Sequence, residues 1–155
     1  MNNGELIQIV ATYDEVMAHW PMFLQGLDEL NATTKRKKVP AGSFLRVLLD
    51  IGASKLNGVN MLLTSKNGKP LAYIVAFDNT SDYGEDKTLW VYCIYSNRKL
   101  VGAARMLFVE LEKWAKERGY TEIQAQSGRT SGASIRWCKS TFGLQLSELF
   151  FSKSI

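Results

Sequence analysis

The sequence contains little cysteine, proline or histidine and no long hydrophobic run. Its two cysteines, Cys93 and Cys138, lie outside any CxxC or Cys/His cluster, so we expect free thiols in a reducing compartment and no metal site. No apolar stretch approaches the length that spans a bilayer, and the first residues lack the basic and apolar segments of a signal peptide. We therefore expect a cytoplasmic protein without a membrane contact.

The composition is that of an ordinary folded domain. The chain has 155 residues, of which 46% are hydrophobic and 22% are charged. This is enough to bury one substantial core and predicts a single domain over residues 1–155. Nineteen Lys and Arg against fifteen Asp and Glu give a net charge of +4. This charge favours an anionic ligand but is too small to indicate nucleic-acid binding.

Hydrophobic periodicity predicts a mixed α/β fold. The predicted order is strand, two helices, three antiparallel strands, helix, strand, helix and strand, at residues 6–11, 12–27, 40–52, 59–64, 71–77, 89–95, 102–118, 121–126, 131–141 and 144–152. Thr12 and Glu15 have the spacing of a capping box, and Pro21 is expected to kink or divide the first helix. Residues 31–38 are expected to form a polar, basic loop.

The junction between the strand at 89–95 and the next helix is the most informative segment. Gly102 and two alanines begin this helix, and Arg98, Lys99 and Arg105 surround its start with positive charge. Free backbone amides at a helix N-terminus bind anions, and a pyrophosphate is the natural occupant. Close packing of a helix against a sheet requires the same small residues, so both interpretations are open at this point.

The pattern Lys99-x-x-Gly102-x-Ala104 resembles the signature of the GNAT (GCN5-related N-acetyltransferase) superfamily, in which Arg or Gln precedes x-x-Gly-x-Gly or Ala. The predicted order of elements matches that family over nearly the whole chain. Residues 133–144 resemble its closing helix and turn. The resemblance implies the GNAT fold, an α/β (α+β) architecture in which a mixed, mostly antiparallel sheet carries helices on both faces.

The resemblance also implies binding of acetyl-CoA or coenzyme A. Backbone amides of residues 100–104 would hold the pyrophosphate, and the pantetheine arm would lie between the strands near 92–95 and 123–126. An amide near Cys93 or Ile94 would polarise the thioester carbonyl. The candidate cofactor-binding residues are Cys93, Ile94, Tyr95, Lys99, Leu100, Val101, Gly102, Ala103, Ala104, Arg105, Thr130 and Ser131.

The candidate catalytic residues are Cys138 and Tyr95. Many GNAT members protonate the leaving thiolate with a tyrosine, which is replaced here by Trp137 or Cys138, and only the cysteine has a proton to give. A lone helical cysteine is otherwise a small buried apolar residue. Strand alternation predicts that Tyr92 and Tyr95 point to opposite faces. The candidates for a general base are water, Asp78, Glu85 and Asp86.

The resemblance implies an N-acyltransferase that acetylates a primary amine of a small molecule or protein by direct transfer. Its acceptor groove would be built by the first two helices, which offer Asp28, Glu29 and the basic residues 35–38. The alternative is a GNAT-like module without turnover, serving a binding or structural role such as that of a phage virion component. A nucleotide-binding domain fits less well, because the chain lacks a Walker motif and Gly-x-Gly-x-x-Gly. Homodimers are common among proteins that resemble this chain.

Overall fold

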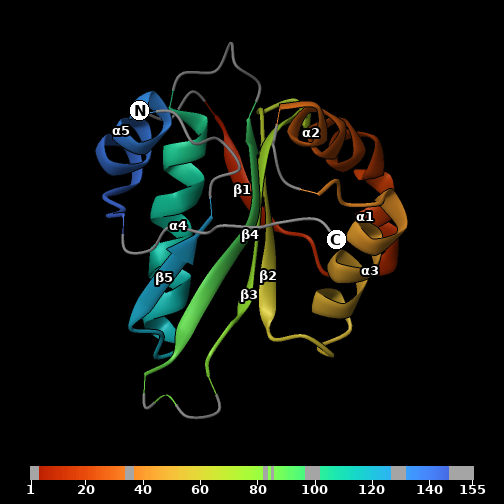
Figure 1. The fold of residues 1–155 in the computed structure, drawn as a ribbon. Coiled ribbons are helices and arrows are strands. Elements are labelled where there is room, and N and C mark those ends of the chain that lie inside the picture. Colours follow the sequence, from red (N-terminus) through yellow and green to blue (C-terminus); the bar gives the residue numbers. More distant parts are fainter. Residues whose placement is uncertain are drawn as a thin grey trace.

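A central sheet of five strands is covered by helices on both faces (Figure 1). The computed structural model describes residues 4–33, 37–81, 84, 86–96, 102–126 and 132–146. The strands are β1 (Leu6–Ile9), β2 (Gly58–Thr64), β3 (Pro70–Asp78), β4 (Thr88–Ser96) and β5 (Glu122–Ala125). The helices are α1 (Tyr13–Ala18), α2 (Trp20–Thr33), α3 (Ala41–Gly52), α4 (Ala103–Glu117) and α5 (Gly132–Phe142). The predicted fold class is confirmed.

The strands lie in the order β1-β2-β3-β4-β5. Neighbouring strands from β1 to β4 are antiparallel, which confirms the predicted meander, whereas β5 pairs with β4 in parallel. A parallel pair needs a crossover connection, and α4 supplies it. The carboxyl ends of β4 and β5 therefore meet the amino end of α4 at one end of the sheet, which we call the Gly102 end; the opposite end is the Tyr120 end.

The first predicted helix is divided in two, as the position of Pro21 indicates. Thr12 caps α1, accepting a hydrogen bond from the amide of Glu15 at 3.2 Å, and the Glu15 carboxylate accepts from the amide of Thr12 at 3.1 Å. This confirms the capping box. The break falls at His19, between α1 and α2, and Pro21 lies in the first turn of α2, where its missing N–H costs no helical bond.

The loop predicted at residues 31–38 begins too early, because residues 31–33 belong to α2, which ends at Thr33. Asn31 explains why the helix continues this far. Its side-chain amide donates to the carbonyl of Val39 at 2.9 Å, and its oxygen accepts from the amide of Val39 at 3.0 Å. The end of α2 is thereby tied to Val39, two residues before α3 begins. At the other terminus, residues 144–146 are not in a strand, and the rest of the strand predicted at 144–152 lies outside the described residues.

Each face of the sheet has its own hydrophobic core. The α4-side core joins α4 to alternate residues of β2, β3 and β4: Val59, Met61, Leu63, Ala72, Ile74, Ala76, Leu89, Val91, Ala103, Leu107, Phe108, Leu111, Ala115 and Tyr120. The core on the other face, which we call the α1–α3-side core, contains Val10, Val16, Phe23, Leu27, Phe44, Leu48, Ile51, Leu62, Tyr73, Val75, Cys93 and Tyr95. The period-two alternation of the strands separates these two sets.

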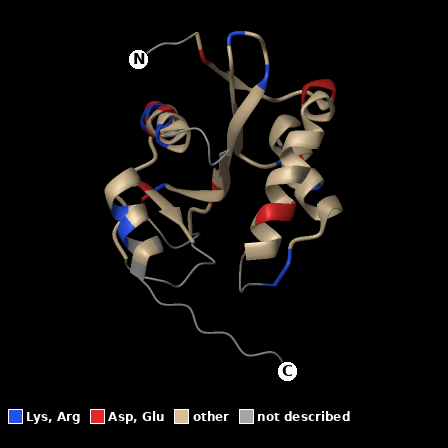
Figure 2. Cartoon of the chain, turned by 90° about the horizontal axis from the view of Figure 1, so that it is seen from above, with Lys and Arg blue, Asp and Glu red and all other residues tan. Residues whose placement is uncertain are grey.

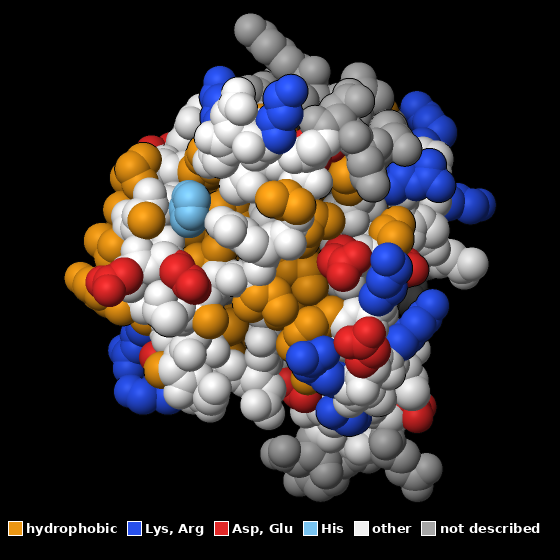
Figure 3. Space-filling model, turned by 180° about the vertical axis from the view of Figure 1, so that it is seen from behind, with side chains coloured by type: hydrophobic (Ala, Val, Ile, Leu, Met, Phe, Trp, Pro, Cys, Tyr) orange, Lys and Arg blue, Asp and Glu red, His pale blue; other side chains and the backbone are white. Residues whose placement is uncertain are grey.

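Strand β1 is an edge of the sheet, and its side chains are poorly covered. Leu6 and Ile9 are 66% and 53% exposed. Figure 3 shows the back of the molecule, where hydrophobic side chains gather in the middle of the face. Within the described residues, no helix has the length and apolar character needed to cross a membrane.

Candidate functional site

The amino end of α4 has the local structure of an anion site. Gly102 occupies the N-cap position with a φ of 88°, a left-handed conformation that side chains disfavour, and it has no side chain with which to cap the helix. The first amides of a helix lack intrahelical partners. Ala103 and Ala104 are buried against the sheet, Arg105 is exposed, and the first turn contains no acidic residue. The geometry and the charge of this turn both favour a negative ligand.

The ladder between β4 and β5 ends before the carboxyl end of β4. Their parallel ladder runs from the Thr88–Glu122 pair to the Val91–Ala125 pair, whereas the ladder between β3 and β4 continues to Ser96. Residues 123–125 are therefore paired with residues 89–91 of β4, so the opening predicted near 92–95 and 123–126 does not lie between these paired residues. This is the end of the sheet at which open α/β folds bind ligands.

A β-bulge changes the direction of the side chains at the carboxyl end of β4. Val75 pairs with Cys93, but the next residue of β3, Ala76, pairs with Val91, so Tyr92 is an extra residue in β4. The predicted alternation of the two tyrosines is consequently wrong. Both Tyr92 and Tyr95 pack against the α1–α3-side core, because a bulge shifts the side-chain register by one.

Hydroxyl groups in that core join β3 and β4 to α2. Tyr73 is fully buried, and its hydroxyl donates to the carbonyl of Phe23 at 3.0 Å and accepts from Sγ of Cys93 at 3.7 Å. Burial raises the pKa of Tyr73 far above its ordinary value, so this hydroxyl remains protonated. Further along β4, the hydroxyl of Tyr95 donates to Oε1 of Glu29 at 3.1 Å.

No protein-family model and no curated protein matches this chain. Solved structures do match it. An aminoglycoside acetyltransferase, meta-AAC0020 from an uncultured soil metagenomic sample in complex with sisomicin, has a TM-score of 0.72 at 12% identity, covering 99% of this chain and 98% of that one. Glucosamine-6-phosphate N-acetyltransferase from Arabidopsis thaliana has a TM-score of 0.70 at 14% identity, covering 97% of both chains. Aminoglycoside N-acetyltransferase AAC(6')-Iy in complex with CoA has a TM-score of 0.69 at 13% identity, covering 100% and 99%.

The chain has the GNAT acetyltransferase fold. Its candidate catalytic residues lie on opposite faces of the GNAT sheet. Tyr95 belongs to the α1–α3-side core, whereas Cys138 lies in α5, which packs on α4 through the ring of Phe142, 4.8 Å from that of Phe108. Cys138 is half-buried, and this burial raises the pKa of its thiol, which therefore stays protonated at neutral pH. The structure does not bring the two side chains together.

The candidate cofactor residues of the GNAT fold are only partly within the described structure. Cys93 faces the α1–α3-side core and Ile94 packs against the α4-side core. Gly102, Ala103, Ala104 and Arg105 form the amino end of α4. Five candidates lie outside the described residues: Lys99, Leu100, Val101, Thr130 and Ser131.

Glu29 was expected in the acceptor groove, but the sequence did not reveal its contact with Tyr95. Its carboxylate meets Tyr95, 66 positions later in the chain, and no local motif marks such a pair. One signal was available: Gly26 and Glu29 are three residues apart and therefore share a face of α2. A glycine on the buried face of a helix indicates close approach to a neighbouring element, and the next polar residue on that face then lies near the same element.

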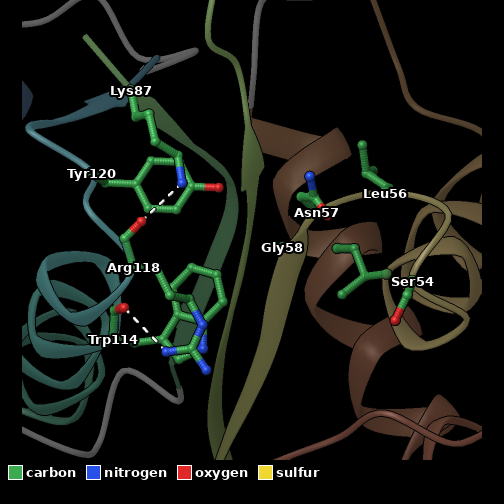
Figure 4. Close-up of a pocket in the computed structure, with 9 residues that line it drawn as sticks. Ser54, Leu56, Asn57, Gly58, Lys87, Trp114, Arg118 and Tyr120 are labelled. Atoms are coloured by element: carbon green, nitrogen blue, oxygen red, sulfur yellow. Dashed lines mark hydrogen bonds between the residues drawn. The ribbon is translucent and has the colours of Figure 1, made fainter.

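A groove of about 380 Å³ lies at the Tyr120 end, beside the carboxyl end of α4 (Figure 4). Gly102 lies at the opposite end of this helix. The groove contains Lys87 and Arg118, but both cations interact with groups of the protein. Nζ of Lys87 donates to the carbonyl of Arg118 at 2.8 Å and lies 4.4 Å from the ring centre of Tyr120. The guanidinium of Arg118 lies 4.3 Å from the ring centre of Trp114. These contacts cap the carboxyl end of α4.

Asp78, one of the candidate bases, belongs to this Tyr120 end. Its carboxylate accepts from the hydroxyl of Tyr120 and from the amide of Thr80, both at 2.8 Å. Burial alone would raise the pKa of Asp78, but the hydrogen bonds from Thr80 and Tyr120 outweigh it and lower that pKa below its ordinary value. Asp86 is exposed, and Glu85 lies outside the described residues. Among the residues of known position, no group of His, Cys, Asp and Glu is arranged to hold a metal ion.

Proposed function

We propose that this protein is an acyl-CoA-dependent N-acyltransferase that uses acetyl-CoA and a primary amine. One observation carries the proposal: the amino end of α4, which has no side-chain cap, lies at the carboxyl end of β4, where that strand continues beyond its ladder with β5. A helix N-terminus beside a strand end that is not paired on this side suits a long ligand with a pyrophosphate and a narrow acyl arm.

The residues at the Gly102 end fit this ligand. The amides of the first turn of α4 would hold the pyrophosphate, with Arg105 and Lys99 adding positive charge. An added Cβ at Gly102 meets no described atom within 4 Å, so the described residues leave room for a phosphate group beside this backbone. Acetyl-CoA would supply the acetyl group as a thioester for direct transfer to the amine. Beyond Val91, the amides near Cys93 and Ile94 in the bulged part of β4 would orient the reacting carbonyl.

The protonation states of the nearby side chains agree with this chemistry. Tyr73 stays protonated, and its hydrogen bond to Phe23 positions β3 against α2. Cys138 keeps its proton at neutral pH, which is the state that a donor to a departing thiolate needs. The separation of Cys138 from Tyr95 by the sheet favours the second candidate function, a domain that binds coenzyme A without turnover.

Calorimetric titration with acetyl-CoA tests the proposal. Wild type is compared with Gly102→Trp, which fills the open space at the amino end of α4, and with Gly119→Trp at the other end of the helix. The two glycines form a matched pair, because Gly119 has a φ of 79° and an added Cβ there also meets nothing described within 4 Å. Backbone strain is therefore similar in both variants.

We expect wild type and Gly119→Trp to bind acetyl-CoA and Gly102→Trp to lose binding. Absence of binding by wild type would overturn the proposal, and equal loss in both variants would assign the effect to folding. Release of free thiol on addition of an amine then separates turnover from the second candidate function, for which binding persists without thiol release.

A further inference from the structure

Helix α2 lies directly on the sheet beside the end of β4. Gly26 permits this contact, because a Cβ there would overlap the hydroxyl of Tyr73 and would lie 2.7 Å from Cγ of Tyr95. Glu29 follows three residues later on the same face of the helix. Because α2 approaches the sheet closely at Gly26, the carboxylate of Glu29 lies beside the end of β4.

One oxygen of the Glu29 carboxylate is held by a hydrogen bond, and no contact of the other oxygen with a described residue is seen. Oε1 accepts the hydrogen bond from Tyr95, a side chain that is only 8% exposed, whereas Glu29 itself is exposed. Within the described part of the chain, no basic side chain forms an ion pair with Glu29. Carboxylates elsewhere do find such partners, as Asp50 does with Arg46. Glu29 thus combines a hydrogen-bonded position with a carboxylate that no described basic side chain pairs.

This charge lies at the Gly102 end, on the face opposite α4. Tyr95 is the penultimate residue of β4, and its partner Glu29 lies in the third turn of α2. Figure 2 looks down on this end and shows the acidic turn of α2 on one side of the sheet, with the basic residues that follow the helix at its tip. The end of β4 therefore lies between the candidate anion site at the amino end of α4 and the carboxylate of Glu29 in α2.

We propose that Glu29 binds the protonated amine of the acceptor, and that Tyr95 positions the carboxylate for this task. The inference rests on the proposed function, since it names the acceptor class of the same site. An ionised carboxylate accepts several hydrogen bonds, and with one directed to Tyr95 the remaining lone pairs can accept from an ammonium group, which has three donors. A lone carboxylate matches a cationic amine better than a metal ion, which requires several ligands. The acceptor is accordingly a primary amine that is charged when it binds.

The simpler explanation is that Glu29 and Tyr95 only tie α2 to β4. Glu29→Gln separates the two explanations, because the amide oxygen of Gln can still accept the hydrogen bond from Tyr95 but carries no charge. Asp28→Asn is the matched comparison: Asp28, the preceding residue, is also exposed and loses the same charge, and its side chain is not the one that bonds Tyr95. A structural tie predicts that both variants bind amines as wild type does.

The experiment is calorimetric titration of the four proteins, wild type, Glu29→Gln, Asp28→Asn and Tyr95→Phe, with sisomicin and with glucosamine 6-phosphate, in the absence of acetyl-CoA. We expect Glu29→Gln to weaken amine binding about tenfold or more, since a charge-assisted hydrogen bond is lost. Tyr95→Phe and Asp28→Asn should each weaken it less than Glu29→Gln does. N-acetylglucosamine 6-phosphate, which has no ammonium group, should bind wild type and Glu29→Gln with equal affinity.

Two results would overturn the inference: equal amine affinity in wild type and Glu29→Gln, or no measurable binding of either amine by wild type. Acetyl-CoA titrations of the same four proteins distinguish a failure of this inference from a failure of the proposed function. If acetyl-CoA binds equally to all four proteins and Glu29→Gln binds amines as tightly as wild type does, only the assignment of Glu29 to the acceptor site fails. If wild type binds amines through Glu29 but does not bind acetyl-CoA, the proposed function alone fails.

Discussion

Replacing Tyr73 by Phe tests whether a buried hydroxyl holds α2 against the sheet. Tyr73 is 0% exposed, its ring lies 4.7 Å from that of Phe23 and 5.6 Å from that of Tyr95, and its hydroxyl donates to the carbonyl of Phe23 at 3.0 Å. The substitution removes one oxygen and keeps every ring contact. Any loss of stability therefore reports the hydrogen bonds and little else.

The expected loss follows from what the hydroxyl leaves behind. The carbonyl of Phe23 lies inside α2, so it keeps its helical N–H partner and is not orphaned. The thiol of Cys93 loses an acceptor at 3.7 Å, but a thiol is a weak donor. The free energy of unfolding should then fall by about 1 kcal/mol, the net value of one buried hydrogen bond. In a domain of this size that corresponds to roughly 2–4 °C in Tm.

Urea denaturation and thermal melting followed by circular dichroism measure this loss. Tyr13→Phe is the control, because Tyr13 is 63% exposed and its substitution should change stability by less than about 0.5 kcal/mol. Burial raises the pKa of Tyr73, so its hydroxyl stays protonated and the difference between the two variants should be constant across the neutral pH range. Equal stability of Tyr73→Phe and Tyr13→Phe would refute the reasoning.

Two further predictions concern the α4 side of the sheet. Leu107→Ala, at a site that is 0% exposed, should cost about 2–5 kcal/mol by leaving a cavity, whereas Val109→Ala on the same helix, 44% exposed, should cost about 1 kcal/mol or less; similar midpoints in urea would contradict the assignment of the core. Burial and the hydrogen bond to Asp78 raise the pKa of Tyr120 to about 12, and Asp78→Asn should move it toward 10, as measured by phenolate absorbance. The raised pKa of Tyr120 stabilises the fold below about pH 10, and this contribution is lost as pH rises through about 12. The lowered pKa of Asp78 stabilises the fold above about pH 4, and this contribution is lost on acidification. Asp78→Asn should therefore weaken the dependence of stability on pH in both the alkaline and the acid range, and an unchanged pH profile would disprove the pairing.

Local features of this protein were predictable from the sequence because they depend on neighbours along the chain. The capping box of Thr12 and Glu15 closes within three residues, and the apolar stripe of α4 repeats at the helical period. The small residues at Gly102 and the φ of 79° at Gly119 follow from the chemistry of helix ends. The order of the β-type segments along the chain was enough to predict the antiparallel meander.

Only the tertiary structure decided how distant segments meet at the candidate site. The bulge at Tyr92 arises from the register between β3 and β4, which no alternation within β4 reveals, and it brings Tyr92 and Tyr95 to one face. The end of the β4–β5 ladder and the meeting of Glu29 with Tyr95 likewise depend on packing between segments far apart in sequence. Such contacts are determined by the fit of whole surfaces, whereas caps and helices are determined by a few residues at a time.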